Sequence, residues 1–152
     1  MNANWPRWIF ASICEHASFT LGTGRELFVE GTKRVADASA DRYELRTNGP
    51  FFNEISAGVW RTEVTVNILV SCTMDDANFQ TLQTNIGIAL GIVVPTIPLY
   101  QYGSQSGIDD DQLFACMTLM NGPVITQYGQ VNPSIEVVQA TVQGRYKVLL
   151  EE

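Results

Sequence analysis

The sequence predicts an α+β protein in which a mostly antiparallel sheet with two long strands is packed by two main helices. Residues Trp60 to Thr73 alternate between apolar and polar side chains, broken only at Leu69, and Ile135 to Leu150 repeats the pattern. Such alternation is typical of a strand with one buried and one wetted face. At ~3.3 Å per residue the first segment spans ~45 Å, against ~17–20 Å for an ordinary strand.

Both long strands, which the sequence places over Val59 to Thr73 and Ile135 to Leu150, are therefore expected to bury one side. On the first strand the apolar side consists of Trp60, Thr62, Val64, Val66, Ile68, Val70 and Cys72. On the second it consists of Val138, Ala140, Val142, Gly144, Tyr146, Val148 and Leu150. Strands this long are expected to extend beyond the core of their own small domain and to be covered by other subunits.

The N-terminal region predicts one helix and one short strand. The helix is expected from Pro6 to Phe19, because proline is tolerated in a first turn and apolar residues recur there at near-helical spacing. Glycines at positions 22 and 24 end it, and Glu26 to Glu30 is expected to be a short strand. The following polar segment, Thr32 to Asp41, shows no period and predicts a surface loop able to order against a neighbour.

The region from Tyr43 to Thr73 predicts either a three-stranded antiparallel meander or a hairpin with one interrupted arm. Tyr43 to Thr47 alternates in character and then meets Asn48-Gly49-Pro50, a strong turn signal. Phe51 to Ile55 resumes the extended chain before the first long strand begins.

The second half predicts a helix followed by strands. Apolar residues at three- and four-residue steps indicate a helix from Asp76 to Val93, which stops at or before Pro95. Residues 94–98 must be extended, because each proline biases its predecessor away from the helical region. Further strands are expected over Leu113 to Met120, Val124 to Val131 and Ile135 to Leu150, with turns at 121–123 and 132–133.

Length and charge favour one domain, residues 1–152, whose surface other subunits cover. A chain of 152 residues is about one domain's worth. Charged residues make up 16% of it, below the ~25% of typical domains, and a surface short of charge favours contact with other chains. The formal net charge of −7 argues against a surface that grips nucleic acid, which needs clustered Lys and Arg.

Cysteine use and hydropathy indicate a protein made in the cytoplasm. Cys14, Cys72 and Cys116 are odd in number, widely spaced and within apolar runs, so we expect buried free thiols. The N-terminus has no long apolar segment, and no stretch approaches the ~18 apolar residues of a membrane span. We therefore expect neither a signal peptide nor a membrane anchor, and no membrane partner.

Signatures of an enzyme are mostly missing. The one histidine, His16, lies two residues from Cys14, and side chains at that spacing on a helix point ~200° apart. Asp109-Asp110-Asp111, in the acidic loop from Gly103, is the only carboxylate cluster, and it lacks the alternating ligands of a calcium loop. We expect a core or capping role for His16, with no catalytic residue, no metal site and no cofactor.

The residues that remain for a partner are aromatic or charged. Trp5 could equally fill the core or anchor a partner, and it shares a helix face with Trp8. The three aspartates are expected first as a solvated or helix-capping run, second as partners of cations on another subunit, and third as a metal site. The candidate subunit interface consists of Trp5, Trp8, Arg61, Glu63, Asp109, Asp110, Asp111, Arg145 and Lys147.

Several segments together resemble the tail-completion and neck proteins of tailed bacteriophages. They are Asn4 to Ile13, Leu27 to Gly31, Tyr43 to Arg46 with Asn48 to Pro50, and the long strand into Val70. The element order is similar to that of phage tail terminators, small α/β subunits forming a ring. The resemblance implies a homo-oligomer, expected as a hexamer, in the virion tail or neck, where it caps the tail tube and docks the head connector.

The resemblance also implies that DNA passes through the lumen of the ring without specific binding. The net charge of −7 fits such a conduit, because an acidic wall repels phosphates. Three rival functions stay open. They are a tail tube subunit, separated by its copy number per virion, a small cytosolic enzyme with a metal at Asp109 to Asp111, and a monomeric regulatory binding module.

Overall fold

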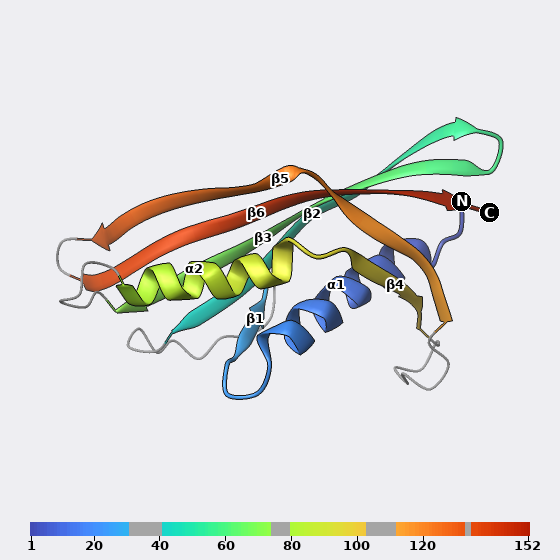
Figure 1. Ribbon diagram of the computed structural model, residues 1–152. Helices are drawn as coiled ribbons and strands as arrows, with labels where there is room; N and C mark the ends of the chain where they lie inside the picture. The colour runs from blue at the N-terminus through green and yellow to red at the C-terminus, as the bar shows by residue number, and fades with distance from the viewer. Residues whose placement is uncertain (31–40, 74–79, 103–111, 133–134) are drawn as a thin grey trace.

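The computed structural model describes residues 1–30, 41–73, 80–102, 112–132 and 135–152. It confirms the α+β class. In that part of the chain two helices lie on one face of a six-stranded sheet of order β1-β2-β3-β6-β5-β4 (Figure 1). The sheet is mixed, because β1 runs parallel to β2 while the four other pairs are antiparallel.

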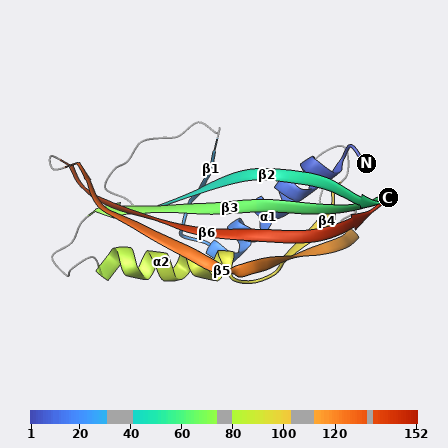
Figure 2. The ribbon, with the colours of Figure 1, turned by 90° about the horizontal axis from the view of Figure 1, so that it is seen from above.

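Four of the strands are far longer than an average strand of ~5–6 residues. The elements in chain order are α1 Trp5–Leu21, β1 Leu27–Val29, β2 Arg42–Ser56, β3 Val59–Thr73, α2 Gln80–Val93, β4 Ile97–Gln101, β5 Gln112–Asn132 and β6 Ile135–Glu151. The 21 residues of β5 alone correspond to ~70 Å of extended chain. Seen from above, the long strands run side by side as an elongated sheet, with α1 behind them and α2 along the β5 side (Figure 2).

The predicted buried sides of both long strands are buried against the helices. On β3, Val66, Ile68 and Val70 are at most 1% exposed, and on β6, Val142 and Tyr146 are fully buried. The period-two pattern therefore placed the core face of the sheet correctly. No helix in the described part of the chain is long and apolar enough to cross a membrane.

Both turn predictions inside the long strands are wrong. At Asn48-Gly49-Pro50 the chain makes an irregularity in the β2–β3 ladder, with Gly49 at φ 100°, and pairing resumes at Phe51. At 121–123 the β5–β6 ladder is interrupted between Met120 and Val124 and then continues. In both places an uninterrupted partner strand, β3 or β6, pairs with both halves, so each turn signal produces a bulge instead of a reversal. The region from Tyr43 to Thr73 is therefore a hairpin with one interrupted arm, not a meander.

Two buried hydrogen bonds tie α2 to the sheet. The Tyr43 hydroxyl donates to Asn85 Oδ1 at 2.8 Å, and the Tyr146 hydroxyl donates to the Val93 carbonyl oxygen. Burial raises the pKa of both tyrosines, so both remain neutral donors near neutral pH. These bonds fix the position of α2 on β2 and β6.

Some expectations fall on segments that lie outside the described residues. They are most of the polar segment 32–41, the helix start at Asp76, and the acidic loop 103–111.

Candidate functional site

Four of the predicted interface residues lie together on the outer face of the sheet, away from the helices. In the β3–β6 register Glu63 is opposite Lys147 and Thr65 is opposite Arg145, while Arg61 is two residues from Glu63 on the same face. Directly opposed side chains are ~4.5–5.5 Å apart at Cβ, and diagonal ones ~7–8 Å. Arg61, Glu63, Arg145 and Lys147 therefore form one group, the outer charged cluster.

The outer charged cluster carries an excess of positive charge in an acidic protein. Arg61, Arg145 and Lys147 are exposed, and Glu63 is half-buried. Within the described residues none of the three cations forms an ion pair. Exposed cations without partners contribute little to folding, so this cluster is available to an acidic partner.

The sheet splits next to this cluster. The first part of β5, residues 112–117, pairs with β4, and only from Thr118, opposite Lys147, does β5 pair with β6. Beyond that point β6 continues to Glu151, and of the strands that the structure describes it pairs with β3 alone. We call the opening between residues 112–117 of β5 and residues 148–151 of β6 the β5–β6 split.

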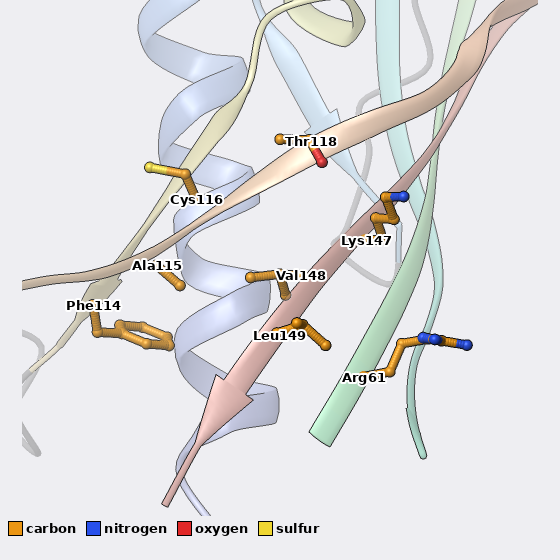
Figure 3. Close-up of a pocket in the computed structure, with 8 residues that line it drawn as sticks. All are labelled: Arg61, Phe114, Ala115, Cys116, Thr118, Lys147, Val148 and Leu149. Atoms are coloured by element: carbon orange, nitrogen blue, oxygen red, sulfur yellow. The ribbon is translucent and has the colours of Figure 1, made fainter. Parts of the chain in front are cut away.

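A pocket lies on each side of the β5–β6 split. The outer pocket, of about 510 Å³, is lined by Arg61, Lys147, Cys116, Phe114 and Leu149 among others (Figure 3). The inner pocket, of about 320 Å³, shares Phe114 and Leu149. Both volumes fall within the ~300–1,000 Å³ of ordinary binding clefts.

The two predicted tryptophans lie on the helix side of the split. Trp5 is 3% exposed and stacks on Phe52 with ring centroids 6.1 Å apart, so of its two expected roles the structure shows the core role. Trp8 is half-buried, donates from Nε1 to the Tyr102 carbonyl oxygen at 2.8 Å and packs against Phe114 with ring centroids 5.7 Å apart. Both tryptophans line the inner pocket.

The far end of the inner pocket holds an ion pair. Glu152 Oε1 accepts a hydrogen bond of 3.1 Å from Trp60 Nε1 and forms an ion pair with the N-terminal ammonium. The hydrogen bond from that ammonium, followed by the one from Trp60, lowers the pKa of Glu152. The split is thus positive at its outer mouth, near Lys147, whereas the N-terminal ammonium compensates the side-chain carboxylate of Glu152 at the end of β6.

A third pocket, of about 530 Å³, lies between α1 and β4, and its polar groups make structural hydrogen bonds. His16 Nε2 donates to the Ile92 carbonyl oxygen at 2.8 Å, which gives the histidine a capping role at the end of α2. Ser12 Oγ accepts from the Tyr100 amide at 2.9 Å. No group of three potential metal ligands occurs within the described residues, and Asp109, Asp110 and Asp111 lie outside them.

Sequence reasoning missed Phe114, Cys116 and Leu149 as residues of the site. Leu149 had a detectable signal, because it is an apolar residue on the polar side of the second long strand, and it is 58% exposed. Phe114 had none, since its position follows from an irregularity between β4 and β5. The sequence therefore indicated the charges of the site but not its opening.

No protein-family model and no curated protein matches this sequence. Function is therefore inferred from the geometry and charge of the site, together with the sequence resemblance described above.

The three thiols are expected to differ sharply in alkylation rate. Cys116 is exposed at the outer pocket, Cys72 is buried, and burial raises the pKa of Cys14 to about 11 from 9.0. Because the thiolate is the nucleophile, Cys14 should react roughly a hundredfold more slowly at pH 8 than a thiol with the ordinary pKa. Timed iodoacetamide labelling followed by mass spectrometry should show one fast site, and a Cys116→Ser control should lose it. Equal rates at Cys14 and Cys116 would contradict this burial pattern.

Proposed function

We propose that this protein is a structural virion subunit that forms a homo-oligomeric ring at the head-proximal end of a phage tail. It caps the tail tube, docks the head connector and acts by assembly, with no catalytic step or cofactor. The sequence resemblance to tail terminators supports the place in the virion. The geometry of the sheet supports the assembly.

The observation that carries the proposal is that the long strands β2, β3, β5 and β6 extend beyond the core that the helices cover. Among the described residues, residues 46–56 of β2 pair with β3 alone, which leaves a long free edge in that part of the chain. Large apolar side chains are exposed on this edge and on two other long strands, namely Phe51 of β2 at 58%, Val124 of β5 at 57% and Leu149 of β6 at 58%. Free edges and exposed apolar residues are liabilities for a protein that stays alone, and contact with further subunits removes them.

Charge gives the proposal an orientation. If the lumen of the ring is acidic so that DNA slides through, the three cations of the outer charged cluster, which form no ion pair with any described residue, do not belong on its wall. The outer charged cluster then faces a neighbouring subunit, the tube or the connector. A map of the assembled ring showing a channel lined mainly by Arg and Lys would overturn the acidic lumen.

The mass of the purified protein in solution tests the proposal. Native mass spectrometry and light scattering should give one closed ring, with a hexamer of the 16.8 kDa chain as the expected species. Labelling in the virion should then place the ring between tube and head. A single monomeric species at high concentration would overturn the assembly, and open-ended tubes would indicate the tube subunit instead.

Reversing the charge of Arg145 should weaken the ring and leave the fold intact. Arg145 is exposed on the outer face, so Arg145→Glu should change the melting temperature little. In the oligomer it replaces an attractive contact by a repulsive one. The protein concentration at which half of the chains are assembled should therefore rise at least tenfold. Gln139→Glu, which adds a carboxylate farther along the same face of β6, is the matched control. Unaltered assembly of Arg145→Glu would remove Arg145 from the interface.

A further inference from the structure

The β5–β6 split exposes backbone groups that a strand would normally cover. In the described structure residues 148–151 of β6 have a ladder partner on the β3 side alone. The amide of Glu152 donates to the Gly58 carbonyl oxygen, at 2.9 Å, on that β3 side. Because backbone groups of successive strand residues point to opposite neighbours, the N–H and C=O groups of Leu149 and Glu151 point into the split.

The walls of the split suit side chains of alternating character. Leu149 and Phe114 line both pockets, so apolar surface faces an occupant from both strands. At the outer mouth Arg61 and Lys147 are cations without an ion pair among the described residues. A segment that fills this opening is therefore expected to be extended, partly apolar and acidic at the end near Lys147.

We infer that the β5–β6 split is an acceptor site for an extended acidic segment of a second copy of this chain. The inference rests on the proposed ring and names the contact that joins its subunits. Charge complementarity selects the donor, since the chain carries a net charge of −7 and holds one run of three successive carboxylates, Asp109 to Asp111. The segment adds a strand to β6 by backbone hydrogen bonds, and its carboxylates meet Lys147 and Arg61.

A synthetic peptide tests the acceptor site directly. The probe is a labelled peptide of residues 104–113, SQSGIDDDQL, and the control peptide, SQSGINNNQL, replaces the three aspartates by asparagine. Fluorescence anisotropy, measured at a protein concentration below that of ring assembly so that the split is free, should show saturable binding of the acidic peptide to the full chain. Binding should be at least tenfold weaker for the control peptide and for the Lys147→Glu protein, but unchanged for Gln139→Glu. Equal binding of both peptides, or no saturable binding, would overturn the inference.

A second measurement tests the backbone part. Leu149→Pro removes an amide that points into the split and that the β3 ladder does not use, while Leu149→Ala removes the same side chain and keeps the amide. Leu149→Pro should bind the peptide at least tenfold more weakly than Leu149→Ala. If the proline variant does not fold, hydrogen exchange on the wild-type chain replaces it, and the peptide should slow exchange at Leu149 and Glu151. Unchanged exchange at both amides would refute strand addition.

The mass of the full chain separates a failure of this inference from a failure of the proposed function. A ring that forms normally with Lys147→Glu, together with no peptide binding, refutes the acceptor site and leaves the ring in place. If the chain stays monomeric but binds the peptide saturably, the ring is refuted, and so is a second copy as the occupant of the split. That result supports only the binding of an acidic extended peptide in the split.

Discussion

Replacing Val66 by aspartate is expected to unfold the subunit. Val66 is 1% exposed at the centre of β3, where Thr47 and Gly144 are its cross-strand neighbours. The substitution loses ~1.5–3 kcal/mol of apolar burial and places a carboxylate in the apolar core, which costs several kcal/mol more. A domain has a total stability of only ~5–15 kcal/mol, so the expected loss removes most or all of it.

The matched control is the next residue along the strand. Asn67 points to the outer face and is half-buried, so Asn67→Asp should cost below ~1 kcal/mol. Circular dichroism with urea or thermal denaturation measures both variants. A Val66→Asp protein that melts like the wild type, with a damaged Asn67→Asp protein, would show that the two faces of β3 had been assigned the wrong way round.

The success of the sequence in this region has a simple physical source. Side-chain direction in a strand alternates with period two, so a run as long as β3 leaves only one assignment of the buried side. The two helices were found for the equivalent reason at their own period, within two residues at the ends of α1. The pattern within a single helix or strand was therefore sufficient to predict which of its sides is buried.

Local signals failed where a partner strand decided the outcome. The Asn-Gly-Pro triplets at 48–50 and 121–123 are typical turn sequences, but the continuous strands β3 and β6 pair with both sides of each. The β5–β6 split also depends on pairing, because β5 changes its partner from β4 to β6 near Thr118. The sequence of one strand does not show with which of two neighbouring strands it will pair.

The close approach of α2 to the sheet gives the second large expected effect. Gly144 on β6 lies under the end of α2, and a Cβ added there would be 2.6 Å from Val93 Cγ1 and 2.9 Å from Leu119 Cδ1. Real Cβ atoms do not approach other atoms so closely, so α2 or its side chains must move. The same contact region holds the hydrogen bond from Tyr146 to the Val93 carbonyl oxygen.

Gly144→Ala is therefore expected to destabilise the fold. Replacing glycine by alanine stabilises a compatible site by ~0.4–1 kcal/mol through the unfolded chain, but overpacking costs ~1–3 kcal/mol, and the 2.6 Å overlap makes overpacking the larger effect. Urea denaturation should show the loss. Val93→Ala removes the nearest clashing atom, so in that background Gly144→Ala should cost at least ~1 kcal/mol less. Strictly additive costs of the two substitutions would mean that Gly144 is not the point at which α2 rests on the sheet.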